Sequence, residues 1–398
     1  MRWPARGAVA LIVILAAACG GQTNAPSAAT TINFWYLSYG AQDAAKAFHA
    51  AHPDIDVKAT KISSLPSALT TANAPDVIEL KREWVAAVAA TGALHEFSPD
   101  EVQTLGGKAA FVAQAWPTGK TTSIPWFIDT RVVYYRADVL KDLNIDPANA
   151  FSNWEAFDHT LDAVKTSKKI AALGIAGKND SNPIAGFAPW IWEAGGSLVS
   201  DDGTKPTINQ SAAVDGVDEY QRFGGRYVDA AVLQQDTAGV ESMFVNGKFA
   251  ITIAGPGLAS KVKGPQFGVQ QFPPGHTGHA VYVGGADLAI VKSSSKQSAA
   301  FEFVKWLTST EGQSSSAAKT GMYPALIAAG QPGPIKSQLA DGRSLPTLTA
   351  WPALEKTMAT DLGKIWDEVI AEGQPMAKDV LQTLLDKTAA DMQTALSQ

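Results

Sequence analysis

Between residues 32 and 90, short apolar runs alternate with stretches in which apolar residues recur at helical spacing. In the second of these segments the small and apolar side chains fall every three or four positions, as on one face of a helix, at Ala44, Ala47, Phe48 and Ala51. The pattern predicts strands at 32–36, 55–59 and 77–80, with helices at 41–51 and 84–90. Strands and helices in this alternation are typical of an α/β fold, with mainly parallel sheets flanked by helices.

The same alternation continues to the C-terminus. Residues 123–135 form a longer extended stretch, rich in β-branched and aromatic side chains, which we interpret as a crossing between two lobes. The remaining predicted elements are strands at 249–254 and 286–291, and helices at 154–164, 212–228, 297–307 and 376–396. Beyond residue 31 the chain has roughly the length of two domains.

The first 19 residues have the layout of an export signal that ends in a lipid-attachment cysteine. Arg2 and Arg6 precede an apolar run at 8–15, which is too short to span a bilayer, and Cys19 is the single cysteine of the chain. The segment resembles a bacterial lipobox, although Ala16 stands where a leucine is usual. We therefore expect a signal peptide at 1–18 and a lipid-anchored flexible tether at 19–31. The alternative is an ordinary signal peptide with an incidental cysteine.

The net charge and the lengths of the apolar runs argue against some classes of function. The 398-residue chain has a formal net charge of −6, and removal of the two signal-peptide arginines would change this to −8. A mildly acidic surface argues against nucleic acid as a partner. After the signal, no apolar run approaches the roughly 20 residues that a transmembrane helix requires. We expect an exported protein held at the extracytoplasmic face of the membrane by Cys19.

Five segments, in this order and at this spacing, resemble one family. They are NAPDVIEL at 73–80, IPWFIDTRVVYYRADVL at 124–140, FVNGKFAITIAGPG at 244–257, GGADLAIVKSSSKQSAAFEFVKWLTSTEGQ at 284–313 and GMYPA at 321–325. The chain resembles extracellular solute-binding proteins of the carbohydrate class, which are receptors of ATP-binding-cassette importers and include the maltose-binding proteins.

The resemblance implies a two-lobed, periplasmic-binding-protein-like fold of type II with a ligand cleft between the lobes. Each lobe would be discontinuous in sequence, the N-terminal one at 32–128 plus 285–328 and the C-terminal one at 129–284 plus 329–398. Lobes of this kind close over a ligand by a hinge motion. The ligand would lie at the carboxyl ends of the strands, where open sheets place their crevices.

Sugar binding requires flat aromatic faces against the C–H faces of the ring, and planar polar groups for the hydroxyls. The aromatic candidates lie in or after predicted strands, or in segments that line the cleft in relatives: Trp35, Tyr36, Tyr39, Trp126, Trp190, Trp192 and Tyr323. For Trp35 and Tyr36 the alternative is packing within the sheet. If 190–192 is helical, its two tryptophans lie about 200° apart, so we expect one to face the cleft and the other the core.

The polar candidates are Lys81, Arg82, Asp129, Asp287 and Arg343. Gly285 permits close approach of a backbone to a ligand, and Gly255 begins the segment GPG at 255–257, which resembles a turn of the family. Asp129 is the strongest of the polar candidates, because a carboxylate accepts two hydroxyl hydrogen bonds, which are stronger when the acceptor is charged. Each has a structural alternative. Lys81 and Arg82 would begin a solvated helix, Asp129 would pair with Arg131 at the hinge, Asp287 would cap a turn, and Arg343 would be a surface charge.

The predicted function is that of a monomeric, non-catalytic receptor. It would bind a mono- to trisaccharide without metal or cofactor and deliver it to a separate permease driven by an ATPase. The first alternative ligand is an acidic sugar or glycerophosphodiester, held by Lys81 and Arg82. The second alternative is a lipid-anchored carbohydrate hydrolase, for which the sequence marks no pair of carboxylates. The HxxH spacings of His49 with His52 and of His276 with His279 lack a third metal ligand.

Overall fold

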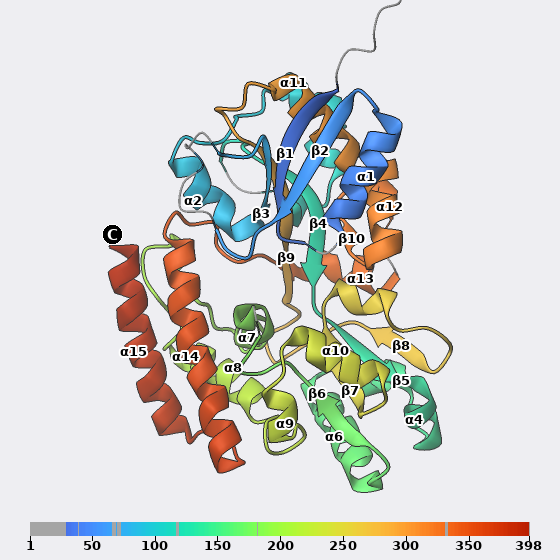
Figure 1. The fold of residues 1–398 in the computed structure, drawn as a ribbon. Helices are drawn as coiled ribbons and strands as arrows, with labels where there is room; N and C mark the ends of the chain where they lie inside the picture. Colours follow the sequence, from blue (N-terminus) through green and yellow to red (C-terminus); the bar gives the residue numbers. More distant parts are fainter. Residues whose placement is uncertain are drawn as a thin grey trace, which may run out of the picture.

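The computed structural model describes residues 29–38, 40–65, 69, 73–116, 119–180, 182–330 and 333–397. It contains two sheets, each covered by helices, and the elements packed on them are called the first and the second lobe (Figure 1). Cys19, the signal segment and Tyr39 lie outside the described residues. None of the described helices has the length and the apolar character that crossing a membrane requires.

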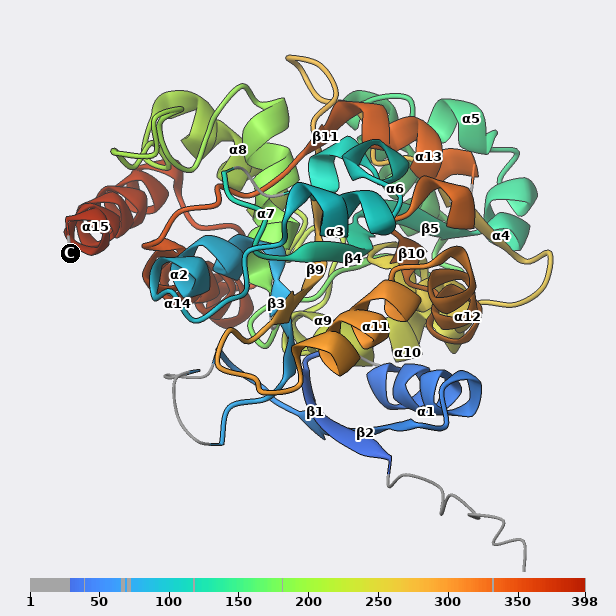
Figure 2. The ribbon, with the colours of Figure 1, turned by 90° about the horizontal axis from the view of Figure 1, so that it is seen from above.

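The first lobe is built on a seven-stranded sheet. Its strands are β1 (Thr30–Tyr36), β2 (Ile55–Lys61), β3 (Val77–Lys81), β4 (Ile124–Thr130), β9 (Val281–Ile290), β10 (Tyr323–Pro324) and β11 (Gly342–Arg343). The order is β10-β4-β9-β3-β1-β2, and β11 pairs with β9. The helices around it are α1 (Ala41–Ala51), α2 (Val85–Ala90), α3 (Pro99–Thr104), α11 (Gln297–Leu307) and α12 (Thr310–Thr320). Figure 2 shows β2 at one edge of this sheet, beside α1.

The second lobe is built on a four-stranded sheet in the order β6-β7-β5-β8. The strands are β5 (Val132–Arg136), β6 (Ala171–Gly174), β7 (Phe249–Ala254) and β8 (Phe267–Gln270). The helices of this part of the chain are α4 (Ala137–Asp142), α5 (Pro147–Ala150), α6 (Trp154–Ser167), α7 (Pro183–Glu193), α8 (Ser211–Gln221), α9 (Ala230–Leu233) and α10 (Thr237–Val245).

Both sheets are mixed, which corrects the expectation of mainly parallel pairing. Strand β1 pairs in parallel with β2 and β3, as the βαβ pattern predicts, but β9 lies antiparallel between β3 and β4. In the second sheet β5 is antiparallel to both β7 and β8. The reason is topological, because β9 returns from the second lobe and enters the first sheet against the direction of its neighbours.

The predicted crossing at 123–135 is confirmed. Strand β4 belongs to the first sheet and β5 to the second, and only Arg131 separates them. The second crossing runs into β9, which begins at Val281, a few residues before the lobe boundary that the sequence suggested. Gln338, the last residue of helix α13 (Gly333–Gln338), contacts the first crossing through its buried amide. Its Nε2 donates to Thr130 Oγ1 at 2.9 Å and to the Arg131 carbonyl at 2.8 Å.

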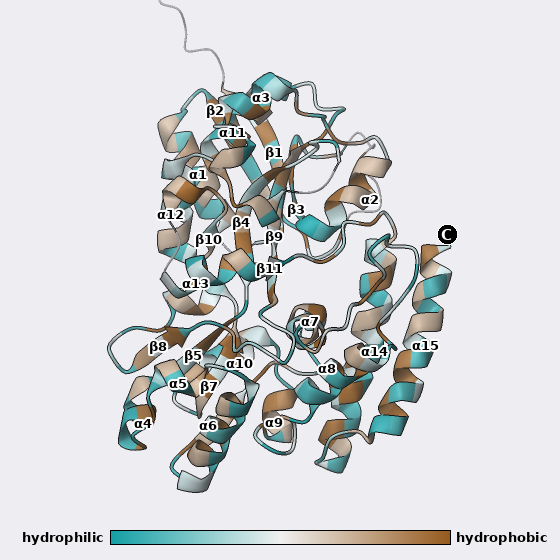
Figure 3. Cartoon of the chain, turned by 180° about the vertical axis from the view of Figure 1, so that it is seen from behind, coloured by the Kyte–Doolittle hydropathy of each residue, from teal (hydrophilic) through white to brown (hydrophobic). Residues whose placement is uncertain are grey.

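Two C-terminal helices complete the second lobe. Helices α14 (Trp351–Glu372) and α15 (Lys378–Leu396) run side by side and pack against α7 and α8 (Figure 1). Each has a hydrophobic and a hydrophilic face (Figure 3). Helix α14 is not among the predicted elements, although its buried residues Trp351, Leu354, Met358, Leu362 and Ile365 recur at helical spacing. The predicted helix at 212–228 is too long, because α8 ends at Gln221, before Gly224 and Gly225.

Candidate functional site

A cavity of about 680 Å³ lies between the two lobes, where the ends of β1, β2 and β3 face helix α14. We call it the interlobe cavity. Its lining residues come from both lobes and are Leu37, Lys61, Ile62, Ser63, Ser64, Leu65, Lys81, Trp84, Asn182, Pro352, Glu355, Lys356 and Ala359. Because all three first-lobe strands present their carboxyl ends here, the cavity lies where an open sheet is expected to bind ligand.

Three side chains join the lobes at the wall of this cavity. Glu355 of α14 accepts a hydrogen bond from Lys81 Nζ at 2.7 Å and another from Trp84 Nε1 at 2.5 Å. Lys81 also lies over the Trp84 ring, with its Nζ 4.7 Å from the centroid. Lys81 is the last residue of β3 and Trp84 ends the turn of 3₁₀ helix that follows it, so a single carboxylate of the second lobe holds the first lobe by two bonds.

Glu79 fixes the loop after β1 against this wall. Its carboxylate is fully buried and accepts the backbone N–H groups of Leu37 and Ser38, both at 2.9 Å, together with the Ser38 hydroxyl. Burial raises the pKa of Glu79, and these hydrogen bonds oppose the rise. Leu37 is consequently held at the rim of the cavity by its own backbone.

Glu83 lies in the same turn and is 3 % exposed. Burial raises its pKa to about 7; Lys81 and Arg82 lower it, and Glu355 raises it further. The carboxyl group also acts electrostatically on the Tyr282 hydroxyl of β9. A carboxyl group that titrates near neutral pH therefore lies beside the pair that joins the lobes.

The charge of the cavity wall is positive. Lys81 is neutralised by Glu355, whereas Lys61 and Lys356 form no ion pair within the described part of the chain. These two lysines come from opposite lobes, Lys61 from the end of β2 and Lys356 from α14, and both are exposed to solvent.

Arg82, by contrast, does not reach the cavity. It is 2 % exposed, and its Nε lies 3.3 Å from Asp287 Oδ1, while Nη1 donates to the Gly284 carbonyl at 2.5 Å. Asp287 is itself fully buried and accepts a bond from the Ser123 hydroxyl at 2.8 Å. The predicted ligand contacts of Arg82 and Asp287 are thus wrong, because the two side chains satisfy each other inside the first sheet.

Asp129 forms the hinge ion pair that was its structural alternative. Arg131 Nη1 lies 2.5 Å from Asp129 Oδ1, and the Arg131 guanidinium lies 5.4 Å from the centre of the Tyr282 ring. A Cβ at Gly255 would lie 2.8 Å from the same Asp129 oxygen, so the glycine leaves room for the pair. The Asp129 side chain remains 24 % exposed. Neither Asp129 nor Gly255 lines the interlobe cavity.

Most of the predicted aromatic contacts are in the core instead. Tyr36, Trp126, Trp190 and Tyr323 are all buried in the large core cluster, and none of them lines the interlobe cavity. Trp126 packs edge-on against Phe34, and the Tyr323 hydroxyl lies 3.3 Å from that of Tyr134. Their strands are covered by helices, so both faces of the sheet are interior.

Trp35 and Gly285 also contact other parts of the protein instead of the interlobe cavity. Trp35 is half-buried and packs against the smaller core cluster of the first lobe. Gly285 has φ of 137°, and a Cβ there would lie 2.1 Å from the Phe127 carbonyl, so the close approach it permits is to strand β4 rather than to a ligand.

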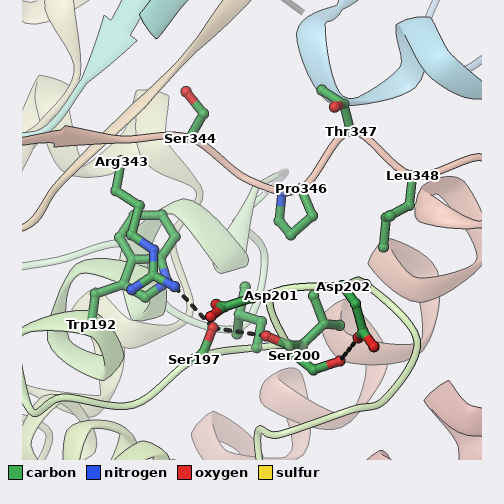
Figure 4. A pocket seen from close by; sticks show the side chains of 13 residues that line it. Trp192, Ser197, Ser200, Asp201, Asp202, Arg343, Ser344, Pro346, Thr347 and Leu348 are labelled. Atoms are coloured by element: carbon green, nitrogen blue, oxygen red, sulfur yellow. Dashed lines mark hydrogen bonds between the residues drawn. The ribbon is translucent and has the colours of Figure 1, made fainter. Parts of the chain in front are cut away.

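Trp192 and Arg343 meet in a second cavity of about 330 Å³ (Figure 4). The Arg343 guanidinium lies 5.0 Å from the centre of the Trp192 ring, and its Nη2 donates to Ser197 Oγ at 2.9 Å. Trp192 was expected to face either the cleft or the core. It is 4 % exposed and lines this separate cavity. Nine of the eleven residues of α7 are buried, so both tryptophans point into the protein interior.

Several residues of the interlobe cavity that were not predicted as site residues lie in or beside helices that were not predicted either. Pro352, Glu355 and Lys356 belong to α14, and Asn182 is the N-cap of α7. The helical spacing of the apolar residues in α14 would have revealed the helix, but nothing in the sequence indicates that it faces β3. Within the described residues, no group of three or more His, Cys, Asp or Glu side chains is arranged to hold a metal ion.

Comparison with known proteins gives consistent matches. The family model of bacterial extracellular solute-binding proteins matches residues 43–342. The chain is 25 % identical over 353 residues to the diacetylchitobiose binding protein DasA of Streptomyces coelicolor, across 79 % of this chain and 80 % of that protein. It is 26 % identical over 350 residues to the sn-glycerol-3-phosphate-binding periplasmic protein UgpB of Agrobacterium fabrum, across 76 % of both. Two other relatives are matched over only 52 % and 54 % of their length.

Among solved structures, the maltose-bound MalE3 of T. maritima superimposes with a TM-score of 0.77 at 19 % identity, across 92 % of this chain and 100 % of that one. This likeness confirms the predicted two-lobed fold.

Proposed function

This chain belongs to the bacterial extracellular solute-binding protein family, and we propose that it is the receptor of an ATP-binding-cassette importer that binds a mono- to trisaccharide in the interlobe cavity. The observation that carries the proposal is the cavity itself, because its wall combines the strand ends of one lobe with a helix of the other. A ligand bound there contacts both lobes, so its binding energy shifts the lobes toward the closed arrangement.

The composition of the cavity suits a small polyhydroxylated ligand. Trp84 offers an aromatic edge, Leu37, Ile62 and Pro352 offer apolar surface, and Asn182 and Ser63 offer planar and hydroxyl groups. DasA, by its name, binds diacetylchitobiose, and MalE3 was solved with maltose. These relatives support a saccharide as the class of ligand.

The same proposal includes export and anchoring. Residues 1–18 would be removed and Cys19 lipidated, so that the lobes are held outside the membrane by the tether at 19–31. The receptor would act as a monomer, deliver its ligand to a separate permease and ATPase, and catalyse no reaction. Release of product from an oligosaccharide incubated with the protein would contradict the last point in favour of a hydrolase.

A second candidate ligand is an anionic one, such as an acidic sugar or a glycerophosphodiester. The observation in its favour is the pair Lys61 and Lys356, which have no ion-pair partner among the described residues and lie on opposite sides of the cavity. They replace Lys81 and Arg82 in this role, since Lys81 is paired with Glu355 and Arg82 is buried. UgpB, by its name, binds sn-glycerol 3-phosphate.

A thermal-shift screen of the protein from Cys19 onward decides between these ligands. The compounds are neutral mono-, di- and trisaccharides, acidic sugars, and glycerol 3-phosphate with glycerol as its uncharged match. A ligand at about 100 times its Kd adds roughly 2.7 kcal/mol to stability. A shift with one neutral saccharide supports the first proposal, and shifts confined to anions support the second. Absence of any shift contradicts both.

We expect Glu355→Ala to lower the affinity for the ligand found in this screen by about thirtyfold, which corresponds to about 2 kcal/mol of binding free energy. The substitution removes the hydrogen-bond acceptor of Lys81 and Trp84. Both side chains are then no longer fixed in the cavity wall, and these two hydrogen bonds between the lobes are lost. Isothermal titration calorimetry measures the change.

Asp215→Ala is the matched control, because Asp215 pairs with Lys378 at 2.5 Å within the second lobe and lines no part of the cavity. We expect it to leave the affinity unchanged. Equal affinities of the Glu355→Ala variant and the unaltered protein would contradict the assignment of the cavity.

A further inference from the structure

The second cavity, like the first, has walls from both lobes, but it lies beside β11 rather than at the ends of β1 to β3. One wall is the segment from Arg343 to Leu348, which follows β11 and is tied to the first lobe by the pairing of Arg343 with Tyr282 of β9 and by a bond from Ser344 Oγ to the Gln114 carbonyl. The opposite wall is Trp192 with the loop at 197–203, which follows α7.

Arg343 is the side chain of the second cavity that offers hydrogen-bond donors to a bound molecule. Its guanidinium is stacked on Trp192 and held by one hydrogen bond, to Ser197 Oγ, so its plane is fixed (Figure 4). It forms no salt bridge with any described residue, although Asp201 acts on it electrostatically, and partial burial lowers its pKa. Most of its five N–H donors are consequently available to a bound molecule.

The two carboxylates of the loop differ in how far they are satisfied. Asp202 Oδ1 accepts bonds from Ser200 Oγ at 2.6 Å, from the Thr204 backbone N–H at 3.1 Å and from Thr204 Oγ1 at 2.8 Å, so it serves its own loop. Asp201 is exposed and accepts no hydrogen bond from another described residue. The cavity therefore presents one fixed donor group, Arg343, and one available acceptor, Asp201.

The presence of both a guanidinium and a carboxylate in the cavity favours an uncharged ligand with hydroxyl groups. An anion that approached Arg343 would be repelled by the two carboxylates, and a cation at Asp201 would be repelled by Arg343. A molecule with several hydroxyls satisfies both, since each hydroxyl can accept from a guanidinium and donate to a carboxylate. The hydroxyls of Ser197, Ser200 and Ser344 on the walls add uncharged hydrogen-bonding groups.

We propose that the second cavity is a separate binding site for a small neutral polyhydroxylated compound, a sugar or a polyol, held between Arg343 and Asp201. The site is distinct from the interlobe cavity, since the two share no lining residue.

The test is a count of bound ligands by equilibrium dialysis, with maltose, D-glucose and glycerol as the probes and the protein from Cys19 onward. For at least one probe we expect a second, independent binding site per chain. Arg343→Gln and Asp201→Asn should each weaken that site at least tenfold and leave the affinity of the interlobe cavity within twofold. Glu355→Ala should have the opposite effect. Asp201 is exposed, so its substitution leaves the fold intact, which a thermal unfolding curve verifies.

Arg226→Gln is the matched control, because Arg226 is also stacked on an aromatic ring, that of Tyr227 at 4.7 Å, yet lines neither cavity. It should change neither site. A single site per chain that responds only to Glu355→Ala overturns this inference and leaves the proposed function standing. Binding that responds only to Arg343→Gln and Asp201→Asn overturns the assignment of the interlobe cavity instead. If no probe binds, the second site is overturned, and the thermal-shift screen remains the test of the interlobe cavity.

Discussion

Arg82→Met should destabilise the protein by about 3–5 kcal/mol, because it leaves the Asp287 carboxylate buried without its partner. Asp287 is fully buried, and in the unaltered protein Arg82 satisfies it while also donating to the carbonyls of Gly284 and Phe127. At roughly 2 °C per kcal/mol, the melting temperature should fall by about 6–10 °C. Differential scanning calorimetry measures the loss.

The pH dependence of this loss identifies its cause. Burial raises the pKa of Asp287, and Arg82 opposes the rise, so removal of Arg82 raises that pKa further. A carboxyl group that is protonated in the folded state costs little to bury. The destabilisation should therefore be smaller at pH 5 than at pH 8.

Arg136→Met is the control for an ordinary ion pair. Arg136 bonds to Asp138 through Nε at 2.9 Å and Nη2 at 2.6 Å, but Asp138 is 48 % exposed, so water can replace the arginine. We expect a loss below about 1 kcal/mol. If Arg82→Met costs no more than Arg136→Met, the buried pair does not hold the first sheet as described.

Glu83→Gln should remove a pH-dependent loss of stability of up to about 3 kcal/mol, an estimate at 1.36 kcal/mol for each pH unit of pKa change. The pKa of Glu83 is about 7 in the folded protein, against an ordinary value of 4.5. Between these two values the folded state binds more protons than the unfolded state. The contribution of Glu83 to stability is therefore complete below pH 4.5 and is lost as the pH rises through 7.

The glutamine variant is neutral at every pH, so it should match the unaltered protein near pH 4.5 and exceed it in stability above pH 7. Urea unfolding across this range, with the two proteins compared at each pH, measures the difference and cancels the contributions of other buried acids such as Glu193, whose pKa burial raises to about 9.

The groups that act electrostatically on or with Glu83 are Lys81 at the end of β3, Arg82 of its own turn, Glu355 of α14 and Tyr282 of β9. Glu219→Gln is a suitable comparison, because burial also raises the pKa of Glu219 to about 7, on helix α8 and beside Arg222. It should show a slope of the same sign. A difference between Glu83→Gln and the unaltered protein that does not vary with pH would contradict the raised pKa.

The sequence by itself determined the elements whose signal is local. The apolar spacing at 41–51 and 297–307 predicted α1 and α11 at their observed bounds, and the extended stretch at 123–135 predicted the passage from β4 to β5. These features depend on periodicity and on the residues next along the chain, which are available in the sequence. The family resemblance added the two-lobed fold.

Only the tertiary structure decided which side chains reach the cavity. Lys81 and Arg82 are neighbours of the same charge, but Lys81 faces Glu355, 274 positions away, whereas Arg82 points into the sheet toward Asp287. Trp190 and Trp192 likewise separate into the core and the second cavity. The physical reason is that burial and charge pairing depend on the surfaces that distant segments present, such as α14 against β3 and β9 between β3 and β4. A local sequence pattern does not determine which distant segment will pack against it.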